Sequence, residues 1–272
     1  MTEKVTVIVP CYNSEPYIRD CLNSILAQSY ENWECVIVND GSPDNIEEAI
    51  QPYLSDSRFK YVSQENKGLP GARNTGIENS SGKYILPLDA DDALAPLSLE
   101  KMVEAFQKYP EALVIYSDSD SFGGEKKAKL SDNIQLKDLL VRNQLYCASM
   151  YKKEDIGDKI RYDNYLKIGV EDWEFWIHLM SEYRNRPFKK IDYPILQKRT
   201  TEESMLGKIK KDEQRSEKIY NYIYQKHLNL YNEFHPSYVK LLTRKLFYEQ
   251  KLEHIYSSKP YRIYNFFAKL FK

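Results

Sequence analysis

The chain has 272 residues, a formal net charge of −1, four cysteines and four histidines. This length fits one large domain, with or without an appendage, and the scattered cysteines and histidines argue against a zinc site. No apolar run of about 18 residues is present and a strand-like segment begins near residue 5, so we expect neither a transmembrane helix nor a signal peptide. Cys11 and Cys35 lie at or near apolar strand-like runs, which suits a reduced cytoplasmic protein.

The first two predicted strands are followed by the same kind of segment. Residues 5–9 form a β-branched run that leads into the polar turn 10–14 and then into an apolar stripe at helical spacing. Residues 33–38 form a second apolar run, followed by the polar turn 39–44 and another helical segment. Because strand, polar turn and helix repeat in this order, the pattern predicts βαβ units and a parallel sheet.

A third strand-like run, residues 84–88, ends in the sequence Asp89-Ala90-Asp91-Asp92. Carboxylates this close repel one another, so a cation between them stabilises the arrangement. Mg²⁺ and Mn²⁺ take one or two carboxylates and leave the other positions to water and substrate phosphates. The stretch is therefore either an anchor for a metal-bound diphosphate or a polar turn with an acid that caps the next helix.

These polar turns all follow the carboxyl ends of predicted strands. Ligands of parallel α/β sheets bind beyond those ends, so we expect Tyr12, Asp40 and Asp91 to meet in one crevice. Neither a Gly-x-Gly-x-x-Gly nor a Gly-Lys-Ser/Thr loop follows the first strand, which argues against a dinucleotide site and a P-loop.

Five motifs, in this order, resemble those of the inverting glycosyltransferases of family 2. They are residues 5–13, 38–44, 65–76, 88–92 and 170–176. The resemblance covers about residues 4–200. It implies the α/β GT-A nucleotide-diphospho-sugar transferase fold, in which a mostly parallel central sheet is flanked by helices. It also implies sugar transfer from a nucleoside diphosphate to an acceptor hydroxyl, with Mn²⁺ or Mg²⁺ as the cofactor.

The resemblance assigns donor-binding roles to residues of the first four motifs and to one later arginine. The implied nucleotide-sugar contacts are Pro10, Tyr12, Asp40, Lys67, Gly68, Arg73, Asp89, Ala90, Asp91 and Arg199. By this resemblance the base stacks on Tyr12, and Asp40 accepts a hydrogen bond from the uracil imide. Structural alternatives stand beside these roles: Tyr12 packed under a turn, Asp40 capping the helix near residue 44, and Arg73 covering the surface.

The fourth motif, residues 88–92, is the metal motif of the family, and the resemblance gives different roles to its three acids. It implies that Asp91 ligates the metal ion, while Asp89 contacts the ribose or a metal-bound water or acts as a second ligand. Asp92 either caps the helix expected after Pro96 or orients the ligating groups.

The acidic motif near residue 171 provides the implied general base. Inverting transfer requires the acceptor hydroxyl to lose its proton, and the resemblance gives this task to Asp172, with Glu171 as the alternative. Residues 171–180 have a helical pattern, on which neighbouring side chains point about 100° apart, so only one of the two acids faces the pocket. The helix dipole alone also favours acids in a first turn. Trp173 either borders the acceptor sugar or packs in the core.

The chain departs from the family pattern after the acidic motif. Many members have a basic residue and a histidine there, whereas residues 197–201 of this chain contain no histidine. Lys198 or Arg199 is then the candidate to neutralise the diphosphate, and a third protein ligand for the metal stays unassigned.

The charge is unevenly distributed. Residues 205–272 carry fourteen Lys and Arg against six Asp and Glu, while residues 1–204 carry 25 against 34. We therefore predict a catalytic domain over 1–204 and a basic, aromatic helical extension over 205–272. Residues 261–272 have a basic amphipathic pattern that suits a membrane surface, the catalytic domain or a second subunit equally. The dilution of the cations by apolar residues argues against nucleic acid as a partner.

The sequence as a whole predicts a metal-dependent inverting hexosyltransferase with a UDP-sugar donor, glucose or galactose being favoured. It would extend a bacterial surface glycan, on a lipid carrier or on a glycoprotein, from the cytoplasmic side, either in solution or at the inner face of the membrane. A nucleotidyltransferase is the first alternative, but it needs a Gly-rich loop that residues 10–14 do not provide. A catalytically silent nucleotide- or glycan-binding protein is the second; Asp91 and Asp172 argue against it. The fold by itself does not choose among these.

Overall fold

The structure, a computed structural model, describes residues 3–122, 127–167, 169–199, 212–235 and 237–261. The chain divides into two compact units, Met1–Ile223 and Tyr224–Lys272. The predicted boundary at residues 204 and 205 lies outside the described residues, so the division into domains stays a prediction.

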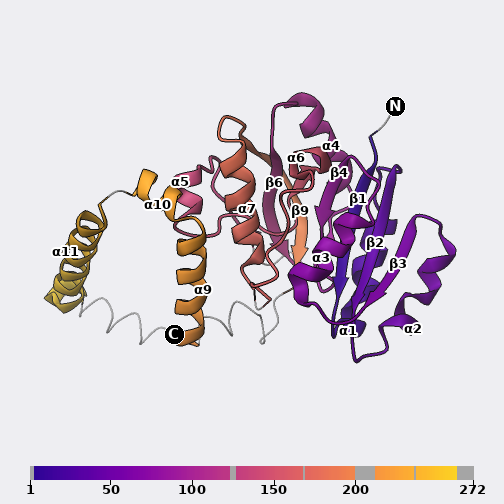
Figure 1. The fold of residues 1–272 in the computed structure, drawn as a ribbon, viewed down its shortest axis with the longest axis horizontal. Coiled ribbons are helices and arrows are strands. Elements are labelled where there is room, and N and C mark those ends of the chain that lie inside the picture. The colour runs from indigo at the N-terminus through magenta and orange to yellow at the C-terminus, as the bar shows by residue number, and fades with distance from the viewer. Residues whose placement is uncertain (1–2, 123–126, 168, 200–211, 236, 262–272) are drawn as a thin grey trace. The chain divides into compact units, whose positions relative to one another are not determined.

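One mixed sheet forms the centre of the first unit (Figure 1). Its strand order is β3-β2-β1-β4-β8-β6-β9-β5, and β7 pairs with β6. The strands are β1 (Val5–Cys11), β2 (Trp33–Asp40), β3 (Phe59–Gln64), β4 (Tyr84–Pro87), β5 (Ala93–Leu94), β6 (Val114–Ser121), β7 (Lys127–Ala128), β8 (Met150–Lys152) and β9 (Phe188–Lys198). The part from β3 to β4 is parallel, as the βαβ pattern predicts, while β8 pairs antiparallel with both β4 and β6.

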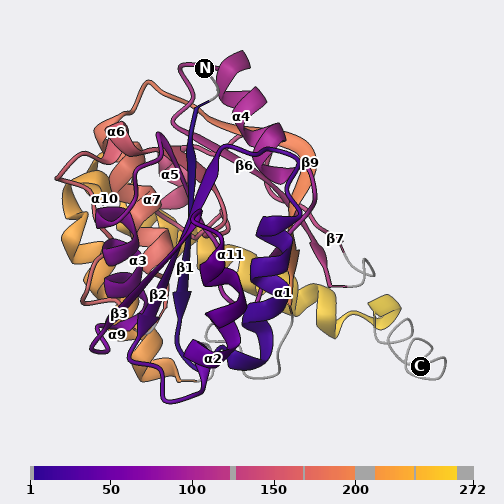
Figure 2. The same ribbon diagram turned by 90° about the vertical axis from the view of Figure 1, so that its right-hand side faces the viewer.

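Helices cover both faces of this sheet, which confirms the predicted α/β class. Figure 2 shows α1 and α4 on one face and α3 and α7 on the other. The helices of the first unit are α1 (Glu15–Leu26), α2 (Ile46–Ile50), the 3₁₀ helix η1 (Gln51–Ser55), α3 (Gly68–Glu78), α4 (Ser98–Lys108), α5 (Leu136–Leu139), α6 (Lys153–Ile156) and α7 (Glu171–Glu182).

Successive side chains of β1 point to opposite faces of the sheet, so this strand contacts both helical layers. Val7 and Val9 belong to the core cluster that contains Ile18 and Cys21 of α1. Ile8 points to the opposite face, where a Cβ at Gly76 of α3 would lie 2.2 Å from its Cγ2. Because Gly76 has no side chain, α3 packs directly on the sheet, and this close contact fixes the position of the polar residues earlier in the helix.

The register of the sheet brings the carboxyl ends of three strands to one edge. Cys11 lies opposite Asn39 in the parallel pair of β1 and β2, and the backbone N–H of Leu88 donates to the carbonyl of Ile8. The turns that follow β1, β2 and β4 therefore leave the sheet at neighbouring points.

The C-terminal part of the chain is helical, as the sequence predicts. It contains α9 (Glu213–Lys226), α10 (Leu228–Phe234) and α11 (Tyr238–Ser257), and α9 spans the division between the two units. The predicted amphipathic segment 261–272 lies outside the described residues except for Tyr261. Within the described part of the chain, no helix is both long and apolar enough to cross a membrane.

Candidate functional site

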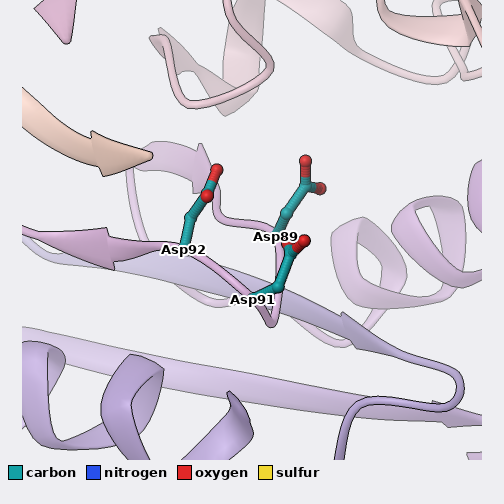
Figure 3. Close-up of side chains that lie close together, drawn as sticks. All are labelled: Asp89, Asp91 and Asp92. Atoms are coloured by element: carbon teal, nitrogen blue, oxygen red, sulfur yellow. The ribbon is translucent and has the colours of Figure 1, made fainter. Parts of the chain in front are cut away.

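Three carboxylates meet in the turn after β4 (Figure 3). The ligand atoms of Asp89, Asp91 and Asp92 all lie within 4.8 Å of one another. Burial and the nearby carboxylate of Asp89 raise the pKa of Asp91 above its ordinary value, and the same causes raise the pKa of Asp92 to about 7. Ionised Asp89 therefore disfavours the ionised forms of Asp91 and Asp92 in the protein alone.

The donor set of this cluster fits a hard divalent cation. Asp92 accepts a hydrogen bond from the backbone N–H of Arg199 at 2.9 Å, and Asp89 accepts one from the Arg73 guanidinium. The carboxylate of Asp91 forms no ion pair with any described residue, which leaves its oxygens for a ligand. Oxygen donors of this kind suit Mg²⁺ and Mn²⁺, so the three acids fit the metal site that the sequence predicts here.

A buried arginine connects the acid cluster to α7. Arg73 is 1% exposed, and its guanidinium donates to Asp89 Oδ1 at 2.6 Å and pairs with the carboxylate of Glu171. Burial would raise the pKa of Asp89, but the pairing with Arg73 holds it below its ordinary value. Both acids are thus kept near one fixed cation. The guanidinium is thus paired with two carboxylates, and the predicted contact of Arg73 with a nucleotide stays a prediction.

Asp172 is the more accessible acid at the start of α7. Its Oδ2 accepts a hydrogen bond from Asn143 Nδ2 at 3.0 Å, and its Oδ1 accepts one from the backbone N–H of Trp173 at 2.7 Å. Burial raises the pKa of Asp172, against the pull of the Arg73 guanidinium. Glu171 is 3% exposed and paired with Arg73. Of the two acids predicted as bases, Asp172 is therefore the less buried, and its role as the base stays a prediction.

Asp40 does not have the capping role that stood as its alternative. The N-cap residue of α2 is Asn45, and no side-chain hydrogen bond caps that helix. Instead, Asp40 Oδ1 accepts hydrogen bonds from Gln64 Nε2 at 2.6 Å and from the backbone N–H of Lys67 at 2.8 Å. Its other oxygen, Oδ2, has no hydrogen-bond partner among the described residues.

The turns after β1 and β2 are tied together by hydrogen bonds. The backbone N–H of Asn13 donates to Ser42 Oγ at 2.8 Å, and that of Glu15 donates to Asp44 Oδ2 at 2.8 Å. Ser42 Oγ in turn donates to Asp44 Oδ1. This network fixes the turn that carries Tyr12, whose side chain is 50% exposed. Tyr12 is thus not packed under a turn, and its ring is open to a ligand.

Four other predicted donor contacts differ widely in exposure. Pro10 and Ala90 are buried, whereas Lys67 is exposed and precedes α3 as its N-cap residue. Gly68 has φ of +79°, and a Cβ there would lie 3.0 Å from the side chain of Lys167. The positive φ and this close approach both favour glycine. Their contacts with a donor stay predictions.

Arg199 and Lys198 differ in how their charges are used. The Arg199 guanidinium donates to the carbonyl of Asp91 at 3.0 Å and to Asp20 at 2.7 Å, and it lies 3.9 Å from the centre of the Phe122 ring. Lys198 lies over the Tyr146 ring and forms no ion pair with another described residue. Burial would lower the pKa of Lys198, but nearby groups, among them the metal-motif acids, raise it overall. Lys198 is therefore a cation near the acid cluster that has no ion pair with any residue the structure describes.

Trp173 packs inside the protein. It is 3% exposed, its Nε1 donates to the carbonyl of Leu139 at 2.5 Å, and its ring meets that of Tyr220 edge-on. A buried indole offers little surface to a sugar, so the observed packing matches the core alternative, and its contact with an acceptor stays a prediction.

Two residues of the site lie in a segment without any motif. Asn143 contacts Asp172, and the thiol of Cys147 donates to Asp89 Oδ2 at 3.3 Å. Both contacts join residues far apart in the sequence, so no local pattern points to them. The segment that follows α5 thus touches both the metal motif and the acid of α7.

The comparisons with known proteins all point to one class of enzyme. The sequence profile of Glycosyl transferase family 2 matches residues 6–247. The chain is 36% identical over 191 residues to glycosyltransferase GlyA of Streptococcus pneumoniae serotype 4 (strain ATCC BAA-334 / TIGR4), which covers 60% of this chain and 27% of GlyA. It is 36% identical over 127 residues to glycosyltransferase GlyG of the same strain, which covers 44% of this chain and 42% of GlyG. In both cases the alignment spans less than half of the relative.

Solved structures resemble the chain in fold. S. aureus TarS 1-349 in complex with UDP-GlcNAc has a TM-score of 0.64 and 23% identity, over 75% of this chain and 60% of that one. The mannosyltransferase PcManGT from Pyrobaculum calidifontis in complex with GDP-Man and Mn²⁺ has a TM-score of 0.59 and 17% identity, over 97% of this chain and 83% of that one. At these identities the likeness concerns the fold alone, and the two neighbours hold different nucleotides.

Proposed function

The chain belongs to glycosyl transferase family 2, and from that premise we propose that it moves a hexose from a UDP-sugar to an acceptor hydroxyl with inversion. The predicted GT-A fold is confirmed by its structural neighbours. The observation that carries the proposal is the connection from the acid cluster through Arg73 to the start of α7, because it joins a candidate cation site to the acids from which a base is drawn.

The nucleotide end of the proposed donor site depends on Tyr12 and Asp40. The half-exposed ring of Tyr12 offers a face for base stacking. Asp40 Oδ2 is left to accept the imide N–H of uracil, since Gln64 and Lys67 use only Oδ1. These contacts favour a uracil nucleotide in the proposal.

The diphosphate end depends on the acid cluster and on one cation. Asp91 would hold Mn²⁺ or Mg²⁺, with Asp89 as the second acid, and the bound ion would offset the charge that develops on the leaving diphosphate. Lys198 supplies a further positive charge that no described carboxylate neutralises by pairing. Arg199, the other candidate for this task, has its backbone N–H and its guanidinium hydrogen-bonded to the loop of residues 91 and 92, so we assign the diphosphate contact to Lys198 in this proposal.

The acceptor end depends on Asp172. In the proposed step the acceptor oxygen forms a bond to the anomeric carbon while the bond from that carbon to the diphosphate oxygen breaks. The electron pair leaves with UDP, and the acceptor proton passes to Asp172. Burial raises the pKa of Asp172 and so makes it a stronger base than an exposed aspartate.

The wider role follows from the sequence prediction. We propose that the acceptor is a bacterial surface glycan on a lipid carrier or on a glycoprotein, and that transfer occurs at the cytoplasmic side. In this proposal the C-terminal helices contact a membrane surface or a second subunit. Glucose and galactose are the favoured sugars of the donor.

The test is UDP, GDP or dTDP release from a panel of nucleotide sugars, with Mn²⁺ and then with EDTA. We expect slow release from one UDP-sugar and none after chelation. If neither release nor Mn²⁺-dependent binding of UDP in calorimetry is found, the proposal is wrong. A catalytically silent binding protein would bind Mn²⁺ and UDP but release nothing from any donor, even with acceptor extracts added.

A further inference from the structure

One neutral side chain faces the carboxylate of Asp172. Asn143 lies 29 positions earlier in the chain, between α5 and β8, and its Nδ2 donates to Asp172 Oδ2 at 3.0 Å. Its Oδ1 accepts a hydrogen bond from the backbone N–H of Leu145 at 3.2 Å. Because Leu145 engages the oxygen of the amide, the NH₂ group is the one turned toward Asp172.

The second oxygen of Asp172 is fixed from its own helix. The backbone N–H of Trp173 donates to Oδ1 at 2.7 Å, so each carboxylate oxygen accepts one hydrogen bond. Each oxygen keeps a further lone pair for a proton. A base held at both oxygens turns little, and proton transfer requires the base to lie within hydrogen-bond reach of the acceptor hydroxyl.

We propose that Asn143 is a positioning residue for the transfer reaction: its amide orients the Asp172 carboxylate toward the acceptor and favours its ionised form. This inference rests on the proposed role of Asp172 as general base. A donor hydrogen bond to a carboxylate stabilises the charged form, so its removal makes Asp172 harder to ionise.

Charged groups from other elements act on the same carboxylate. Arg73 of α3 favours ionisation of Asp172, whereas Asp89, which follows β4, and Glu171, its neighbour on α7, oppose it. The thiol of Cys147 lies on the same segment as Asn143 and faces Asp89. None of these groups changes when Asn143 is replaced, which lets a shift in titration be assigned to the lost amide.

The experiment compares Asn143→Leu with wild type in the pH dependence of UDP release to water from the UDP-sugar that the panel selects. Leucine is close to asparagine in size but has no donor. We expect the acidic limb of the kcat profile to move up by about one pH unit, which is about tenfold in rate on that limb, with calorimetric UDP and Mn²⁺ affinity unchanged. Gln144→Leu is the matched control, since Gln144 has no hydrogen bond to any described residue.

A second measurement works without turnover. The carboxyl ¹³C signal of Asp172, identified by its loss in Asp172→Asn, should titrate at higher pH in Asn143→Leu than in wild type. If Asn143→Leu does not fold, Asn143→Ala serves in its place, because it also removes the amide donor to Asp172 and adds no charge.

The outcomes separate this inference from the proposed function. If Asp172→Asn keeps wild-type turnover, the proposed function of Asp172 is wrong. If Asp172→Asn is inactive but Asp172 titrates in Asn143→Leu as it does in wild type, only the role of Asn143 is overturned. An equal shift in Gln144→Leu would also overturn it.

Discussion

Arg73 of α3 and Glu171 of α7 form a buried ion pair between residues that lie 98 positions apart in the sequence. The same guanidinium donates to Asp89 at 2.6 Å. One cation thus joins the helix packed on β1 and β2, the turn of the metal motif and the helix whose first turn carries the candidate base. Both partners are carboxylates, so loss of this cation leaves two acids near each other without compensation.

Replacement of Arg73 should therefore destabilise the fold. For Arg73→Met we expect the free energy of unfolding to fall by about 3–5 kcal/mol, because removal of one partner leaves buried charge unpaired. Urea denaturation measures this. Arg73→Lys should recover only part of the loss, since a lysine does not pair with two carboxylates as a planar guanidinium does. If Arg73→Lys keeps wild-type stability and only weakens UDP binding, the arginine acts on the nucleotide and not as the bridge.

Replacement of Asp91, the proposed metal-binding residue, should weaken the binding of Mn²⁺ and UDP. We expect Asp91→Asn to lose Mn²⁺-dependent UDP binding in calorimetry and to slow UDP release by about a hundredfold or more, because the charge on the leaving group is then not offset. Thermal stability should stay equal or rise, since Asp91 is held beside other carboxylates. The control is Asp158→Asn, which changes an exposed acid in a weak surface ion pair. Tight Mn²⁺·UDP binding by Asp91→Asn would refute the metal assignment.

Replacement of Lys198 should affect the KM for the donor, whereas replacement of the adjacent Arg199 should affect the Tm. For Lys198→Gln we expect the KM for the donor to rise by about tenfold with no change in Tm, because a single charge–charge contact with the diphosphate is lost. For Arg199→Gln we expect a lower Tm, because its guanidinium holds Asp20 and the carbonyl of Asp91. Steady-state kinetics and a melting curve for each variant distinguish the two roles. A higher KM in Arg199→Gln and a lower Tm in Lys198→Gln would show that Arg199 is the residue that contacts the diphosphate.

A buried carboxylate at the opposite edge of the sheet should make stability depend on pH. Glu34 is 2% exposed and accepts hydrogen bonds from Thr6 and Ser81, while Lys60 and Lys4 pair with it. Burial would raise its pKa, but these donors lower it well below the ordinary value of 4.5. For Glu34→Gln we expect a loss of about 2 kcal/mol at neutral pH, because the lysines lose their partner.

The sign of the pH effect follows from the lowered pKa. The stabilisation by ionised Glu34 is fully present above its ordinary value of 4.5 and is lost as pH falls toward the lower folded value. Unfolding free energies measured down to acid pH should therefore converge for wild type and Glu34→Gln. Glu47→Gln is the control, because Glu47 accepts its hydrogen bond from Tyr61 at an exposed position. A constant difference at every pH would contradict the linkage.

Much of the fold followed from local pattern. Apolar β-branched runs predicted β1 and β2, and the burial of every residue in both strands agrees with that prediction. The helix predicted at 171–180 is α7. The antiparallel placement of β8 between β4 and β6 was not predictable, because β8 has only three residues and its partners are far away in the sequence.

The sequence alone determined which chemistry-bearing groups the chain contains and that several of them, including Tyr12, Asp40 and Asp91, follow the carboxyl ends of strands. It suggested Asp91 and Asp172 because motif spacing is a local property. Only the tertiary structure decided how each charge is used: Arg73 is committed to two acids, Arg199 braces a loop, Lys198 has no ion pair with a described residue, and Asn143 faces Asp172. The physical reason is that pairing, burial and hydrogen bonding depend on neighbours in space, which the packing of α3 and α7 on the sheet brings together.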